Sequence, residues 1–125
     1  MVFTVGRKKR RLAQIDHQCS LLLRRVNDEG PACQAACLRG VLFAFTLAQE
    51  KKVDGWSERQ IFALLTDKGM PLAGKPSCEG LGFGLVSFMY ECRAMRSREA
   101  LRLAARISDQ IASILINAID ERHWK

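Results

Sequence analysis

The sequence has no uninterrupted hydrophobic run long enough to cross a bilayer. Its longest nearly apolar run, residues 41–48, contains Thr46 and is far shorter than the roughly 20 residues that a transmembrane helix needs. Residues 13–26 follow the basic N-terminal region and contain charged groups such as Asp16 and Arg24, unlike the apolar core of a secretory signal. These absences predict a cytoplasmic protein that does not insert into a membrane.

The sequence also has no internal repeat, no low-complexity tract and no long linker of proline, glycine and serine. With 125 residues and 48% hydrophobic content, it has the usual size of one domain and enough apolar residues for a core. We therefore expect a single helical domain over residues 1–125. Residues 1–6 are expected to be a flexible basic tail that leads into the first helix.

Histidine is scarce. Neither His17 nor His123 has a sequence neighbour that suggests a nucleophile–base pair. The spaced glycines Gly80, Gly82 and Gly84 have neither the preceding strand nor the Gly-Lys-Ser/Thr ending of a nucleotide-binding loop. Close approach to a neighbouring helix explains them better. We therefore expect no enzymatic activity and no cofactor.

The five cysteines are Cys19, Cys33, Cys37, Cys78 and Cys92. An odd number of cysteines without an export signal favours reduced, buried thiols over a disulfide framework. A zinc site is the alternative, because Cys33 and Cys37 lie one helical turn apart and could be joined by His17 and Cys19 from a second helix. The usual Cys-x2-Cys spacing is absent, so packing as small hydrophobic residues is favoured and no metal site is predicted.

The hydrophobic spacing predicts an all-α, single-domain bundle of about five helices. The predicted helices cover residues 8–27, 32–51, 57–68, 77–95 and 98–122. Residues 32–51 are apolar on nearly every side, so this helix is expected at the centre of the bundle. The long C-terminal helix, 98–122, carries an apolar seam that could pack within the chain or form a homodimer. The seam consists of Ala100, Ala104, Ile107, Ile111, Ile114 and Ala118.

Several helix ends have clear local signals. Gly30 fits the position that ends the first helix, and Ser97 can cap the last one. The start of the helix at 77–95 is less well defined, because each of its three glycines costs roughly 1 kcal/mol relative to alanine in a helix interior. This helix could instead begin at Leu85.

Residues 57–68 form the most sharply bounded predicted helix. Ser57 and Gln60 fit a capping box, and Gly69 fits the left-handed position that ends a helix. Short capped helices of this kind are the first helix of many helix-turn-helix units.

The pattern around this helix is Asp54-Gly55-Trp56-Ser57-x-Arg59-Gln60-Ile61-x-x-Leu64-Leu65-x-x-Lys68-Gly69-Met70-Pro71, followed by Gly74-Lys75. Over about residues 42–77 the chain resembles the helix-turn-helix region of the large serine recombinases. There a capped helix is followed by a Gly-Ile-Pro turn, a glycine-rich loop and a DNA-reading helix, so the resemblance implies DNA binding. The chain has no room for that family's catalytic serine domain, so recombination chemistry is not implied. Residues 77–84, where the recognition helix would be, are poor in the Arg, Asn and Gln side chains that contact base edges.

The net charge of +7 is concentrated in two parts of the chain. The first 25 residues hold seven basic residues against Asp16, and a second cluster over residues 93–106 is opposed within its span only by Glu99. Two such patches suggest an anionic partner, with nucleic acid favoured over a membrane surface. The predicted nucleic-acid-binding residues are Arg7, Lys8, Lys9, Arg10, Arg11, Arg59, Lys68, Lys75, Arg98, Arg102 and Arg106.

The sequence thus predicts a small DNA-binding regulator of transcription or an accessory protein, with DNA or another nucleic acid as its partner. The alternative is a helical adaptor or inhibitor that binds an acidic protein surface, because basic patches would also orient that encounter. For the ridge of Arg98, Arg102 and Arg106, which are four residues apart, a solvated helix face is an equally open interpretation.

Overall fold

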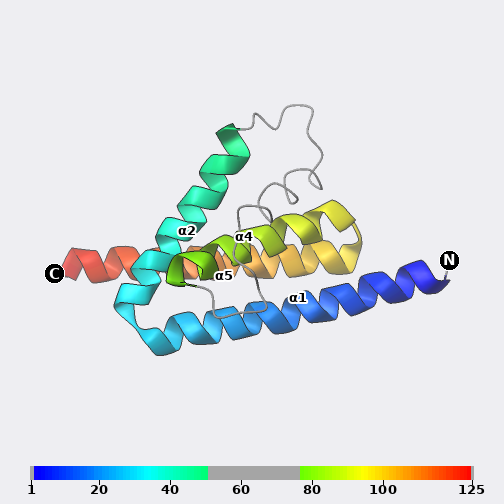
Figure 1. The fold of residues 1–125 in the computed structure, drawn as a ribbon, viewed down its shortest axis with the longest axis horizontal. Helices are drawn as coiled ribbons and strands as arrows, with labels where there is room; N and C mark the ends of the chain where they lie inside the picture. Colours follow the sequence, from blue (N-terminus) through cyan, green and yellow to red (C-terminus); the bar gives the residue numbers. More distant parts are fainter. Residues whose placement is uncertain (1, 51–76, 125) are drawn as a thin grey trace.

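The computed structural model describes residues 2–50 and 77–124 and, within them, the side chains of residues 6–50 and 77–119. The described residues form an all-α four-helix bundle of α1 (Val2–Glu29), α2 (Pro31–Glu50), α4 (Cys78–Met95) and α5 (Arg98–Trp124) (Figure 1). The all-α prediction is confirmed. The predicted helix at 57–68 lies outside the described residues, so the described part contains four helices where about five were predicted for the chain.

The first helix begins earlier than predicted. α1 starts at Val2 rather than near residue 8, so the prediction of a flexible tail over residues 1–6 is wrong from Val2 onward. The one residue in this stretch with a strong helix penalty is Gly6, which disfavours a helix by about 1 kcal/mol and does not stop one.

Gly30 ends α1, as predicted, and it is the single residue between α1 and α2, where the predicted ranges 8–27 and 32–51 left four. Its φ of 86° lies in the left-handed region that glycine adopts without a steric penalty. The amide of Gln34 donates to the Gly30 carbonyl at 3.1 Å, which forms the first hydrogen bond of α2.

Serine side chains cap the other two helices. Ser77 Oγ accepts a hydrogen bond from the amide of Gly80 at 3.1 Å, so α4 begins directly after Ser77 and the later start at Leu85 is wrong. Ser97 Oγ accepts from the amide of Ala100 at 3.1 Å, which confirms the predicted cap of α5. One such cap typically stabilises a helix by about 1 kcal/mol.

The most deeply buried helix is α4, and not residues 32–51 as predicted for the centre of the bundle. Each described helix contacts the other three, but only α4 has a long unbroken buried stretch, from Gly80 to Met89. α2 instead leans away from the bundle toward its C-terminal end (Figure 1), where Leu42 and Phe43 are 52% and 53% exposed. Both helices are apolar, and apolar composition alone does not decide which of them has neighbours on every side.

Two glycines set the crossing of α2 and α4. A Cβ atom on Gly82 would overlap the carbonyl oxygen of Cys37, and one on Gly40 would overlap the carbonyl oxygen of Glu79. The backbones of the two helices therefore touch at a separation that only a residue without a side chain permits. This confirms, for Gly82, the prediction that the spaced glycines allow close helix packing.

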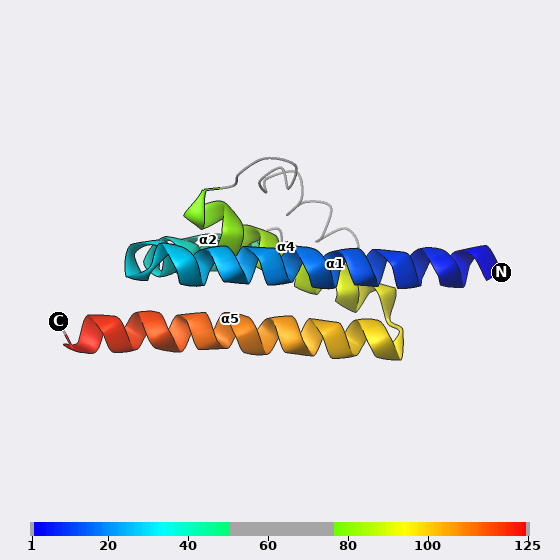
Figure 2. The same ribbon diagram turned by 90° about the horizontal axis from the view of Figure 1, so that it is seen from below.

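Helices α1 and α5 lie side by side and run in the same direction, while α4 runs the opposite way (Figure 2). The predicted seam of α5 is buried in the chain from Ala100 to Ala118, so it serves packing within the bundle. A second, outward-facing side of α5 remains exposed, with Leu101 at 48%, Ile116 at 58% and Ile119 at 54%.

Over its whole length, α2 is long and apolar enough to cross a membrane. Its 20 residues meet that criterion by length and composition. The shorter apolar run at 41–48, from which no membrane span was predicted, is too short on its own to cross a membrane. Within the structure, 39% of its most apolar window is buried against other helices. The core helix of a protein in water meets the same criterion, so this feature does not distinguish the two settings.

Candidate nucleic-acid interface

The fold brings the two basic clusters together. Arg106 Nη2 of α5 lies 3.5 Å from Asp16 Oδ2 of α1. This contact shows which residues of the two parallel helices lie side by side. Both helices rise by about 1.5 Å per residue, so Arg98 and Arg102 lie beside the part of α1 that precedes Asp16 (Figure 2). That part contains the cluster at residues 7–11. Clusters separated by about 90 residues in the sequence thus share one end of the bundle.

Seven of the predicted side chains in this region are exposed. We call them the basic surface: Arg7, Lys8, Lys9, Arg10, Arg98, Arg102 and Arg106. The ion pair between Arg106 and Asp16 is long, and its two side chains are 62% and 51% exposed, so solvent screens it strongly. This pair leaves Arg106 accessible to a phosphate.

Arg11 has a different environment from the rest of its cluster. Its guanidinium makes a paired contact with the carboxylate of Glu91, with 2.7 Å between Nη2 and Oε1, and lies 5.7 Å from the centre of the Phe88 ring. The hydrogen bond to Glu91 raises the pKa of Arg11. The side chains of Arg11 and Glu91 are only 35% and 13% exposed. Arg11 therefore holds α1 against α4, which removes it from the basic surface.

Two arginines next to the basic surface were not among the predicted site residues. Arg93 is exposed at the end of α4, with its guanidinium 5.8 Å from the centre of the Tyr90 ring. Arg96 is exposed in the turn to α5, where its backbone is left-handed, with a φ of 60°. Both belong to the charged stretch at 93–106, and that stretch was the signal that could have identified them.

The remaining predicted contacts, Arg59, Lys68 and Lys75, lie outside the described residues, as does the capped helix that carries the helix-turn-helix pattern. The structure therefore leaves these three contacts as predictions.

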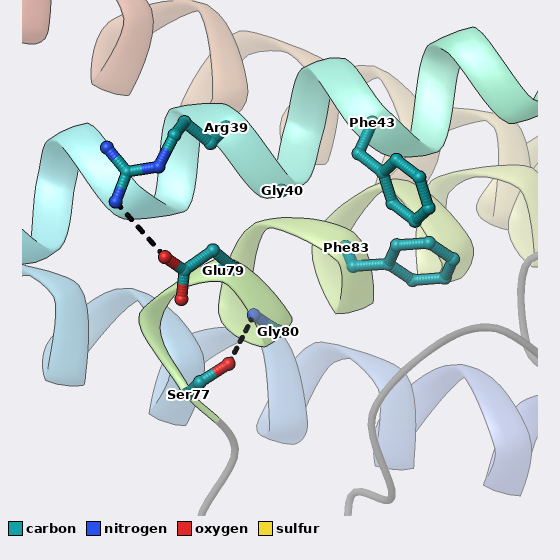
Figure 3. Close-up of a pocket in the computed structure, with 7 residues that line it drawn as sticks. All are labelled: Arg39, Gly40, Phe43, Ser77, Glu79, Gly80 and Phe83. Carbon is teal, nitrogen blue, oxygen red and sulfur yellow. Dashed lines mark hydrogen bonds and ion pairs between the residues drawn. The ribbon is translucent and has the colours of Figure 1, made fainter.

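A pocket of about 310 Å³ opens where α2 crosses the start of α4 (Figure 3). Phe43 and Phe83 form its apolar side, with 5.9 Å between the ring centres. Arg39 and Glu79 pair across its rim at 3.1 Å. The amide of Glu79 itself and the guanidinium of Arg39 lower the pKa of the Glu79 carboxyl group. This carboxylate in the first turn of α4 disfavours a phosphate, so the pocket suits an apolar group.

The cysteine predictions need correction. Cys33 and Cys78 form a disulfide, so the expectation that all five cysteines are reduced thiols is wrong. Cys19, Cys37 and Cys92 are buried free thiols, as expected. Burial raises the pKa of Cys19 and Cys92 to about 12 and that of Cys37 to about 11, so these thiols are unreactive.

The alternative zinc set is not assembled. Cys33 is bonded to Cys78, while His17 is exposed on α1 and Cys37 is buried one turn further along α2. Metal-ligating atoms gather instead at Glu29, Cys33 and Cys78, all within 4.8 Å of one another. A disulfide sulfur has no thiolate to give to a metal, so this set does not form a metal site in the structure as it stands.

Comparison of the chain with models of known protein families, with curated proteins and with solved structures finds no match.

Proposed function

We propose that this chain is a small nucleic-acid-binding regulator or accessory protein that holds its partner through the basic surface. The observation that carries the proposal is the parallel course of α1 and α5, which places two basic clusters from opposite parts of the chain side by side. A cluster on one helix is often a solvated face. Two clusters that share one end of the fold add their positive charges there, which attracts a polyanion.

The spacing of the arginines suits a phosphate backbone. Arg98, Arg102 and Arg106 follow one another by four residues, which is a step of about 6 Å along a helix. Each phosphate that such a side chain neutralises releases condensed counterions and adds about 0.9 to the slope of log affinity against log salt concentration. Contacts of this kind supply affinity without sequence preference.

In this proposal, sequence preference comes from the segment that resembles the helix-turn-helix of the large serine recombinases. Arg59, Lys68 and Lys75 would contact DNA from there, which favours duplex DNA over other polyanions as the partner. The proposal also places the protein in the cytoplasm and assigns it no catalytic role.

A DNA titration at two salt concentrations tests the proposal. The double variant Arg98→Ala/Arg102→Ala should bind duplex DNA more weakly on every sequence and lower the salt slope by about 1.8. The matched variant is Arg24→Ala/Arg39→Ala, which removes the same charge from exposed sites outside the basic surface. It should leave the slope unchanged. Equal losses in both variants, or no binding by the wild type at about 50 mM salt, would reject the basic surface as the interface.

A second candidate is an adaptor or inhibitor that binds an acidic protein. The exposed Leu42 and Phe43 and the pocket beside them favour it, because apolar groups at a surface are typical of protein interfaces. Replacing Phe43 by serine should abolish capture of such a partner and leave the DNA titration unchanged. The reverse result would favour the nucleic-acid function.

We further propose that a homodimer of the chain would use the outward side of α5, because its predicted seam is buried. Ile116→Asp places a charge on that side, three residues from Ile119, and should shift a dimer to a monomer in sedimentation. Asn117→Asp, at another exposed position of the same helix, is the control. A wild-type monomer at all concentrations would contradict this arrangement.

A further inference from the structure

The Cys33–Cys78 disulfide joins the first turns of two helices. Cys33 is the third residue of α2, and Cys78 is the first residue of α4. The amides of a first helical turn lack partners within the helix and carry partial positive charge, which stabilises a thiolate beside them. The position at a helix start therefore favours the thiolate form of either cysteine.

The two sulfurs differ in their accessibility. Cys33 is only 4% exposed, whereas Cys78 is partly exposed at the surface end of α4. A thiolate that arrives from solvent can therefore reach the sulfur of Cys78 more easily than that of Cys33. This asymmetry defines an attacked sulfur and a leaving sulfur.

A carboxylate lies against both sulfurs. Glu29 Oε2, at the end of α1, is 3.4 Å from Cys33 Sγ and 3.5 Å from Cys78 Sγ. Arg25 Nε donates to the same oxygen at 3.0 Å and holds it in place. Groups from α1, α2 and α4 thus meet at one point, with a proton acceptor within reach of either thiol.

We propose that Cys33, Cys78 and Glu29 form a thiol–disulfide exchange site for low-molecular-weight thiols such as glutathione. A glutathione thiolate attacks Cys78 Sγ, the bond to Cys33 breaks, and its electron pair leaves with Cys33 Sγ, which then takes up a proton. A second glutathione thiolate attacks the glutathione sulfur of this mixed disulfide and releases the Cys78 thiolate, which is protonated in turn. The protein disulfide gains two electrons and two protons, and two glutathione thiols become one glutathione disulfide.

In the reverse direction Glu29 accepts the proton of the Cys33 thiol. The resulting Cys33 thiolate attacks Cys78 Sγ, expels glutathione and restores the disulfide. The other three cysteines do not compete, because each is buried and none is paired with a second sulfur.

Single serine variants test which sulfur is attacked. Reduced Cys33→Ser keeps the accessible Cys78 and should form a mixed disulfide with glutathione disulfide, visible by intact mass. Reduced Cys78→Ser keeps only the buried Cys33 and should react at least about tenfold more slowly. Cys37→Ser removes a buried thiol elsewhere, keeps the disulfide and should form no stable adduct. Equal rates in the first two variants, or faster reaction of Cys78→Ser, would overturn the proposal.

The wild-type chain gives a test that does not depend on how the variants fold. The folded chain is incubated in glutathione buffers without denaturant, freed of glutathione at low pH and only then unfolded, so that a maleimide reagent counts all of its thiols. The count should be three without reduction and five after it. Reduction that requires denaturant would instead show a purely structural disulfide and refute the exchange site. Glu29→Gln should slow the return to the disulfide by at least about tenfold, because a general base is lost. An unchanged rate would remove Glu29 from the site.

Discussion

Replacing Gly82 by alanine tests the packing of α4 against α2. A Cβ at this position would overlap the carbonyl oxygen of Cys37 and lie 2.9 Å from its carbonyl carbon and 3.0 Å from the amide nitrogen of Val41. All three atoms belong to the backbone of α2. No side-chain rotation can relieve the overlap, so α2 and α4 must separate.

The expected loss is the balance of two effects. Alanine gains about 1 kcal/mol over glycine from its better helix propensity. Against this, overpacking of a core costs typically about 1–3 kcal/mol. A separation of the helices by 0.5–1 Å would also remove roughly a quarter to a half of the dispersion energy of the contacts around the crossing. The backbone overlap places Gly82 at the high end of this range, so we expect a net loss of about 2 kcal/mol.

Urea denaturation followed by circular dichroism measures this loss, and Gly6→Ala is the matched control. A Cβ on Gly6 would meet only Arg10 Nη2, at 3.9 Å, so this variant should be more stable than the wild type by about 0.5–1 kcal/mol. Gly40→Ala, on the facing helix, should lose stability as Gly82→Ala does, and the double variant should lose less than the sum because both open the same crossing. A Gly82→Ala protein as stable as the wild type would refute the close approach of the two helices.

Three further outcomes follow from described contacts. Arg11→Ala should lower the free energy of unfolding by about 1–2 kcal/mol in urea denaturation, because the carboxylate of Glu91 stays largely buried without its partner. This figure is reduced from that of a fully buried pair because Arg11 is partly exposed. An unchanged midpoint would contradict a structural role for Arg11. Reduction of the Cys33–Cys78 disulfide should lower stability by at most about 4 kcal/mol, from the 45-residue separation that it closes; a more stable reduced chain would contradict this. The lowered pKa of Glu79 contributes stability that is complete above its ordinary value of 4.5 and is lost as pH falls through the folded-state value. The melting temperatures of wild type and Glu79→Gln should therefore converge below that pH, and a constant difference would argue against the shift.

The features that could be predicted from the sequence are those decided within a few residues. Gly30 ends α1 because its left-handed backbone suits glycine, and Ser97 caps α5 because its hydroxyl is positioned to accept an amide three residues ahead. The apolar seam of α5 was also identified correctly, because a helical period shows which residues share a face. These determinants are local, and the structure retains them.

The features that were missed depend on contacts between distant segments. Arg11 belongs to a basic run in the sequence, but the fold places Glu91 beside it and turns it inward. The disulfide required knowledge that Cys33 and Cys78 lie in the first turns of two helices and that the fold brings these turns together. Likewise, α2 packs closely on α4 because Gly40 and Gly82 let the two backbones touch. Helix propensity registers these glycines only as unfavourable to a helix, so it gives no sign of this packing.

The two proposed sites lie at opposite ends of the bundle, and this makes them separable. The sulfurs of Cys33 and Cys78 join the turns near the end of α1, while the basic surface surrounds its beginning (Figure 2). Two described helices run between these ends: α1, which leads from the basic surface to Glu29, and α4, which starts at Cys78 and carries Glu91, the partner of Arg11, near its other end. If reduction only releases the first turns of α2 and α4, the Arg11 contact persists and DNA affinity in the reduced chain should equal that in the oxidised chain. A loss of affinity on reduction that Arg11→Ala reproduces in the oxidised chain would instead show that α4 transmits the change, because that variant frees α1 from α4 without touching the disulfide.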